Sequence, residues 1–152
     1  MNRIAIAAAC ALATSVAFAG PFDAFKGKMK EGMYETKMEM DMSGMPGLPP
    51  NMAKQTMTHQ KCVTDKDIED GGWGKGKDGK GPNDSCEIKN MKMSGNSATY
   101  TMECKSPKMT ADTKINFTNA GYVMDMDMTS DHGGQAMKMK QHVEGTYIGP
   151  CK

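Results

Sequence analysis

Arginine is almost absent from this chain of 152 residues, and leucine and aromatic residues are scarce. Arg3 is the only arginine, and Phe, Trp and Tyr together make up 6% of the residues. Without Arg3 the chain carries 18 Lys against 18 Asp and Glu, a formal charge of zero. Proteins that bind nucleic acid or anionic membranes rely on arginine and on net positive charge. The composition therefore argues against both kinds of partner.

Long apolar runs are also missing, apart from one near the start of the chain. Arg3 belongs to a short basic start, residues 4–16 are apolar but too few to span a bilayer, and residues 17–19 are Ala-Phe-Ala. This is the organisation of a secretory signal peptide with its cleavage site. We therefore expect a signal peptide over 1–19 and one domain over 20–152, in the periplasm or secreted, with no membrane insertion after cleavage.

Four of the five cysteines lie beyond residue 19, namely Cys62, Cys86, Cys104 and Cys151. An even number of cysteines in an oxidising compartment favours two disulfides. A hairpin centred on Gly95 places Cys86 directly opposite Cys104, at a separation that a disulfide can bridge. The predicted pairs are therefore Cys86–Cys104 and, by elimination, Cys62–Cys151.

Alternation of apolar and polar residues predicts an all-β fold. The pattern has period two, with methionine or another apolar residue on one face and charged residues on the other. We expect an antiparallel meander that forms a curved sheet or a partly closed barrel, stapled by two disulfides. Residues 43–53 and 70–85 are rich in glycine, proline or lysine and are expected to be loops. The expected strands are 34–42, 54–62, 87–93, 97–104, 108–117, 122–128 and 136–147.

The segment 121–140 has the strongest hairpin pattern, with two alternating runs around a glycine-bearing turn. One register satisfies charge pairing and apolar pairing at the same time. The expected partners are Asp127 with Lys138, Asp125 with Lys140, Met126 with Met139, Met128 with Met137, and Tyr122 with Val143.

Methionine is abundant where other large aliphatic residues are rare: beyond residue 19 there are 17 Met against one Leu, four Ile and three Val. Residues two apart on a strand lie about 7 Å apart on one face, and neighbours across strands about 5 Å apart. Such clusters of thioethers suit a soft ion such as Cu(I). The alternative is plain core packing, for which methionine is well adapted. The candidate metal ligands are Met124, Met126, Met128, Met137 and Met139.

Three functions remain open. The first is a non-enzymatic binding module for a small hydrophobic ligand or partner, and the second is soft-metal binding. The third is scavenging of oxidants by reversible sulfoxide formation, for which Met42, Met45 and Met52 are the expected exposed sites. The histidines have no metal-binding spacing, although Met57 and His59 share a strand face. No catalytic residues are predicted, because no nucleophile motif is present and the cysteines are expected to pair.

A set of short motifs is spread over nearly all of the chain beyond residue 19. The motifs are Glu31-Gly32-Met33-Tyr34-Glu35, the segment Gly44-Met45-Pro46-Gly47 to Pro50, Gln60-Lys61-Cys62, the spaced Cys86 and Cys104, and Gly149-Pro150-Cys151. Together they resemble a family of secreted bacterial proteins, the domain-of-unknown-function family numbered 3617, although Tyr34 stands where the family tends to have tryptophan. The resemblance implies an exported, disulfide-bonded, mostly β domain without established catalytic residues.

Overall fold

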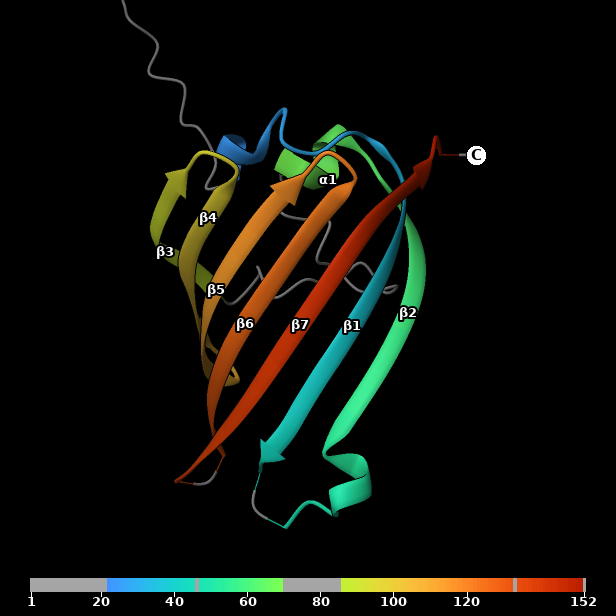
Figure 1. Cartoon of the computed structure of the whole chain (residues 1–152). Helices are drawn as coiled ribbons and strands as arrows, with labels where there is room; N and C mark the ends of the chain where they lie inside the picture. Colours follow the sequence, from blue (N-terminus) through green and yellow to red (C-terminus); the bar gives the residue numbers. More distant parts are fainter. Residues whose placement is uncertain (1–21, 46, 70–85, 133, 152) are drawn as a thin grey trace, which may run out of the picture.

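Seven antiparallel strands form one curved sheet, in the order β2-β1-β7-β6-β5-β4-β3 (Figure 1). The computed structural model describes residues 22–45, 47–69, 86–132 and 134–151. The predicted all-β fold is confirmed, and the sheet stays open, with β2 and β3 as its edges. The strands are β1 (Gly32–Gly44), β2 (Lys54–Val63), β3 (Cys86–Ser94), β4 (Ser97–Lys105), β5 (Lys108–Thr118), β6 (Gly121–His132) and β7 (Gln135–Gly149).

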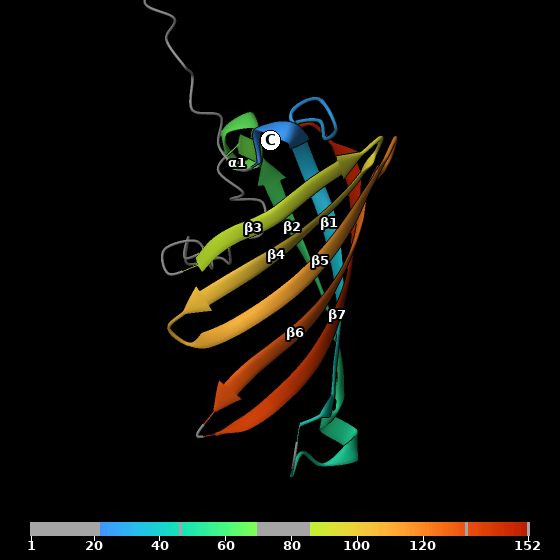
Figure 2. The same cartoon turned by 90° about the vertical axis from the view of Figure 1, so that its left-hand side faces the viewer.

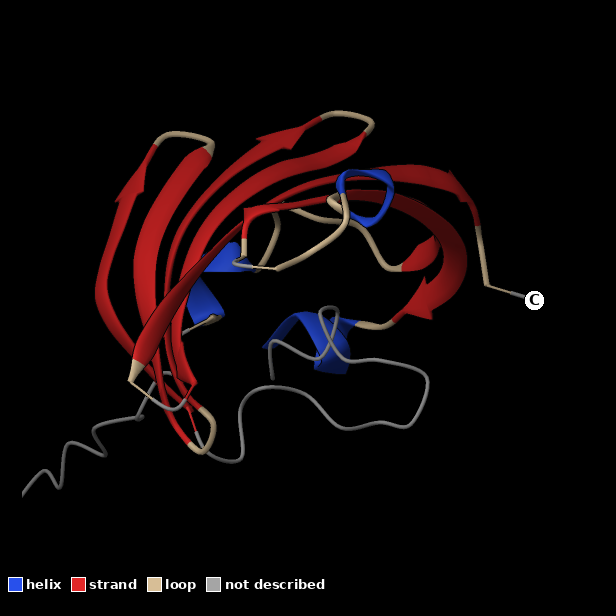
Figure 3. Cartoon of the chain, turned by 90° about the horizontal axis from the view of Figure 1, so that it is seen from below, coloured by secondary structure: helices blue, strands red, loops and turns tan. Residues whose placement is uncertain are grey.

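The main core lies at one end of the concave side of the sheet. There the helical segments η1 (Asp23–Phe25) and α1 (Asp65–Glu69) lie in the hollow of the sheet (Figure 3). Phe25 is fully buried, with its ring centroid 4.9 Å from that of Phe117, and Ile68 of α1 is 2% exposed. Burial raises the pKa of Tyr100 in this core to about 12. A third short helix, η2 (Pro50–Met52), lies between β1 and β2 and buries no residue.

The predicted register of the β6–β7 hairpin is wrong by two residues. Asp127 pairs with Lys140 and Asp125 with His142, while Met128 pairs with Met139 and Met126 with Gln141. Tyr122 and Val143 are likewise not partners, since Tyr122 pairs with Gly145 and Val143 with Met124. The faces are as predicted, because a shift of two residues preserves the alternation.

The turn explains this shift. His132 pairs with Gln135, so only two glycines separate the strands. Gly134 has φ of +86°, which suits the primed turns that fit the twist of a hairpin. The Asp131 carboxylate accepts a hydrogen bond of 2.9 Å from the Gly134 N–H. The predicted pairing centres the turn on His132 and Gly133 instead, and so puts a histidine where a type I′ turn needs a positive φ that glycine adopts more easily.

Both predicted disulfides are confirmed. Cys86 and Cys104 are directly opposite partners in β3 and β4. Cys62–Cys151 joins the end of β2 to the second residue after β7, and so spans the intervening strand β1.

A bulge in β3 brings two methionines to the concave side. The pairing shifts between Lys89 and Lys92, and Asn90 has φ of +55°. One extra residue reverses the alternation beyond it. As a result Met91 and Met93 pack against the same core as Ile88, whereas strict alternation turns them outward.

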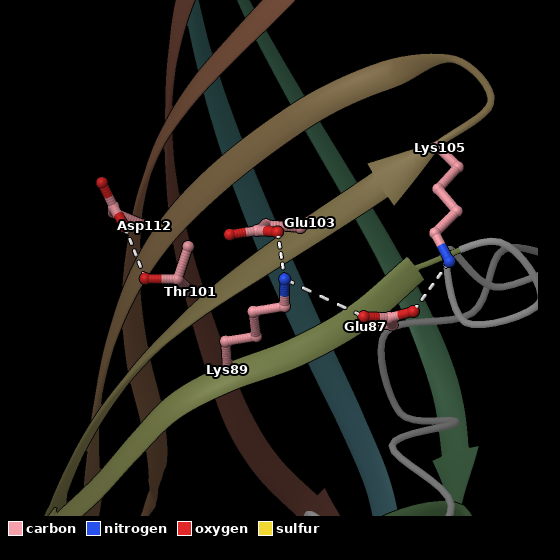
Figure 4. Close-up of polar contacts among 6 residues, drawn as sticks. All are labelled: Glu87, Lys89, Thr101, Glu103, Lys105 and Asp112. Carbon is pink, nitrogen blue, oxygen red and sulfur yellow. Dashed lines mark hydrogen bonds and ion pairs between the residues drawn. The ribbon is translucent and has the colours of Figure 1, made fainter.

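The convex face carries exposed, mutually paired charges. Over β3 and β4, Lys89 pairs with Glu103, and Lys105 lies 2.9 Å from Glu87 (Figure 4). Exposed ion pairs of this kind stabilise a fold only slightly, and they keep this face solvated.

The sheet twists so strongly that β3 and β4 pass in front of β1 and β2 in a side view (Figure 2).

Candidate functional site

The concave face is divided between a capped end and a methionine-lined end. At the capped end, η1 and α1 complete the core with Phe22, Phe25 and Ile68. Toward the other end of the strands the same face continues with side chains that are only half-buried. The methionine-lined end consists of Met38 and Met40 of β1, Met109 of β5, Met126 and Met128 of β6, and Met137 and Met139 of β7.

Within the methionine-lined end, five thioethers and one hydroxyl surround a cavity of about 40 Å³. This methionine pocket is lined by Met45, Met109, Met128, Ser130, Met137 and Met139.

Strand register places these side chains in two neighbouring rows. Met109, Ser130 and Met137 are successive partners across β5, β6 and β7. Met128 and Met139 are partners in the adjacent row. Cross-strand partners lie about 5 Å apart, so the side chains converge on a shared space.

Ser130 and Met45 complete the pocket in different ways. Ser130 is the only small residue of its row, and its short side chain leaves space between two long methionines. Met45 follows β1, where its N–H donates a 2.9 Å hydrogen bond to the Met42 carbonyl. This turn contains Gly44, which lies against Lys138 near the start of β7.

Three of the five predicted metal ligands line this pocket, namely Met128, Met137 and Met139. The other two do not. Met124 is 7% exposed within the core of the capped end, and Met126 packs against that core.

Sequence reasoning missed Met109 as a pocket residue. It is the β5 partner of Ser130, which the true β6–β7 register joins to Met137. The predicted register places Gln135 opposite Ser130 instead, so the row of Met109, Ser130 and Met137 was not apparent. The two consecutive glycines in the sequence are the signal that favours the observed register.

The exposed fractions of the methionine side chains can be compared with the predicted sites of oxidation. Of the three methionines expected to be exposed, only Met52 is exposed, at 47%, and the expectation is wrong for Met42 and Met45, which are half-buried. Met57 is also 47% exposed. Met45 also lines the methionine pocket.

The edge strand β2 adds polar groups to the concave side. Met57 and His59 are the partners of Met38 and Thr36, so they share the concave face, and Lys61 is the partner of Tyr34. The thioether and imidazole thus lie at alternate positions of one edge strand, as the sequence suggests.

A second, polar depression of about 530 Å³ lies over the convex face of β1, β2, β6 and β7. His142 there has Nδ1 2.6 Å from Asp125 and Nε2 3.3 Å from Glu144. The hydrogen bond to Asp125 raises the pKa of His142 above its ordinary value of 6.5, and burial partly opposes this rise. Among the residues that the structure describes, no group of three or more His, Cys, Asp or Glu side chains is arranged to hold a metal ion.

Together these features define a disulfide-stapled, all-β domain with one open antiparallel sheet. Residues 29–151 match the family described as protein of unknown function (DUF3617), and the chain belongs to this family. No curated protein and no solved structure matches the chain. Across the described ranges, none of the helices has the length and apolar character needed to cross a membrane.

Proposed function

We propose that this protein is an exported, non-enzymatic binding module that holds an amphiphile with a hydrocarbon chain and an acidic head group. The observation that carries the proposal is the unequal covering of one apolar face. The capped end is completed by η1 and α1, while the methionine-lined end of the same face is left half-exposed. A contiguous apolar surface indicates a binding site, whereas single exposed apolar residues do not.

The choice of methionine supports a flexible apolar ligand. Methionine has three rotatable bonds and a polarisable sulfur, so it adapts to irregular or varied partners. A face that serves only for internal packing gains nothing from this, because leucine specifies a packed core better. A hydrocarbon chain lying over Met38, Met40 and Met126 is the kind of ligand that such a surface fits.

The polar residues of β2 support an acidic head group. His59 and Lys61 follow Met57 at alternate positions on the concave face of the edge strand. An ammonium group and an imidazole can both donate hydrogen bonds to an acidic head group, and both adjoin apolar side chains. The two disulfides fit an exported location, where such bonds persist.

Titration with a long-chain fatty acid, followed by displacement of a fluorescent fatty-acid probe, tests this function. Met57→Asp places a charge beside the hydrocarbon chain of the ligand and leaves the buried core unchanged. Binding should weaken about tenfold or more, since a factor of ten in affinity corresponds to only about 1.4 kcal/mol. Met52→Asp is the matched control, because Met52 is equally exposed, at 47%, but lies on η2.

The head group is tested separately. Lys61→Glu should weaken binding of the fatty acid and leave binding of the corresponding alcohol unchanged. Absence of saturable binding in the wild type, or an equal loss in Met57→Asp and Met52→Asp, refutes the proposal.

A further inference from the structure

We propose that the methionine pocket is a binding site for one soft monovalent metal ion, Cu(I), with Ag(I) as its closest chemical mimic. The site goes beyond amphiphile binding and does not depend on it, because none of the six lining residues belongs to β2. Its donors come from β5, β6, β7 and the turn after β1.

The donor set is almost purely thioether. Five of the six lining residues are methionines, and thioether sulfur is a soft, neutral ligand that selects Cu(I) over hard or borderline ions. The rigid sheet fixes four of them on strands: Met109, Met128, Met137 and Met139. Met45 approaches from the turn after β1 and supplies a further donor. Three or four sulfurs from different strands suffice for a closed Cu(I) site.

The cavity has the size for a single ion. Its volume of about 40 Å³ exceeds the roughly 10–15 Å³ that a cavity needs to hold one water molecule, and it is far below the roughly 300–1,000 Å³ of pockets for organic ligands. Long methionines on all sides can move their sulfur atoms inward by small rotations, because the side chain has three torsions. Ser130 creates the space, since a large residue at this position fills it.

The donor set also predicts how affinity depends on pH. Metal sites built from Cys or His lose affinity in acid because their ligands take up protons. None of the six residues that line the methionine pocket titrates between pH 5 and 8. Cu(I) affinity should therefore stay constant over this range.

The experiment is an anaerobic titration of the full exported chain with Cu(I), kept reduced by ascorbate so that the disulfides stay intact, against a chromogenic Cu(I) chelator. We expect one ion per chain. Titration with Ag(I), followed by NMR of methionine methyl groups, should shift the pocket methyl signals while those of Met52 and Met57 stay in place. Zn(II) should produce neither effect.

Two pairs of variants show whether Cu(I) binding depends on the cavity or only on the number of methionines in the chain. Ser130→Val fills the cavity, fits a strand and keeps every thioether, so Cu(I) affinity should fall at least about tenfold, as even outer partners of a metal site affect affinity by about 10- to 100-fold. Ser130→Ala keeps the space and should bind like the wild type. Replacing Met128 and Met139 by Leu should also abolish stoichiometric binding, whereas Met52→Leu with Met57→Leu should not.

The proposal is overturned by any of three results. These are wild-type-like affinity in Ser130→Val, equal losses in the pocket and surface methionine variants, or Ag(I)-induced shifts confined to exposed methionines. Because the NMR measurement uses the unmodified protein, it decides the question even where a variant fails to fold. Met57→Asp should lose fatty-acid binding and keep Cu(I) binding. Failure of the amphiphile proposal can therefore be told apart from failure of the Cu(I) proposal.

Discussion

At the scale of single residues, Tyr122 and Gly145 show how closely neighbouring strands fit. They are direct partners in β6 and β7, and a Cβ built on Gly145 lies 2.2 Å from the Tyr122 ring. The ring therefore covers the glycine backbone on the concave face. Glycine is needed at this position for space.

Replacing Gly145 by Ala should destabilise the domain by about 1–3 kcal/mol, the usual cost of overpacking a filled core. Urea unfolding measures the loss. The double variant Gly145→Ala with Tyr122→Leu should recover part of it, because the smaller side chain vacates the contested space. If the losses in the free energy of unfolding simply add in the double variant, the contact between the Tyr122 ring and position 145 is not the cause of the destabilisation.

His142 gives the convex face a weak dependence on pH. Its ring faces Asp125 and Glu144, and Glu39 is its partner across β1. Because the folded-state pKa is raised above 6.5, the charged ring stabilises the fold fully below that pH. This stabilisation is lost as the pH rises through the raised pKa.

The variant His142→Gln should therefore lower the free energy of unfolding at pH 5.5 and have less effect at pH 8.5. The ring is 39% exposed and screened by solvent, so the difference should be about 1 kcal/mol or less. Urea unfolding of both proteins at the two pH values measures it. A larger loss at pH 8.5 contradicts the assignment.

At the scale of elements, the β6–β7 hairpin shows which forces set a strand register. The charge pattern is compatible with two pairings that differ by two residues, since Asp127 can oppose either Lys138 or Lys140. Exposed pairs contribute too little to choose between them. The two-residue glycine turn chooses the observed pairing.

Exchanging the charges of Asp127 and Lys140 should consequently be almost neutral. Their charged atoms are 3.3 Å apart, and the side chains are 69% and 78% exposed. We expect the exchanged variant to unfold within about 1 kcal/mol of the wild type. Lengthening the turn by one residue after Gly134 is the contrasting change, and should cost more. If the charge exchange is the more damaging of the two, charge pairing sets the register.

At the scale of the whole molecule, the two disulfides constrain very different lengths of chain. Cys62–Cys151 closes a separation of 89 residues, and Cys86–Cys104 one of 18. In the chain-entropy account, a 15-residue loop is worth about 3 kcal/mol and a 100-residue loop about 4.7 kcal/mol.

Removing Cys62–Cys151 by paired substitution to Ala should thus reduce stability by about 1 kcal/mol more than removing Cys86–Cys104. Thermal or urea unfolding of the two double variants measures the difference. The reverse order indicates that anchoring the edge strand β3 matters more than the closure of a long loop.

The sequence by itself determined the seven strands, the faces of these strands apart from the bulged part of β3, the cysteine pairing and the family. Period-two alternation is a local property that survives any shift of two residues, so Asp125 and Met126 could be assigned to opposite faces without knowing their partners. The Cys86–Cys104 pairing also lies within one hairpin, and the second pair followed from it.

Only the tertiary structure decided which residues meet across strands, and therefore where a site forms. Met109, Ser130 and Met137 belong to three strands, and their row exists in only one register. Met45 reaches the same cavity from a turn more than sixty residues earlier in the chain than Met109. Such contacts depend on turn geometry, bulges and sheet curvature acting together, and no periodicity in the sequence records their combined effect.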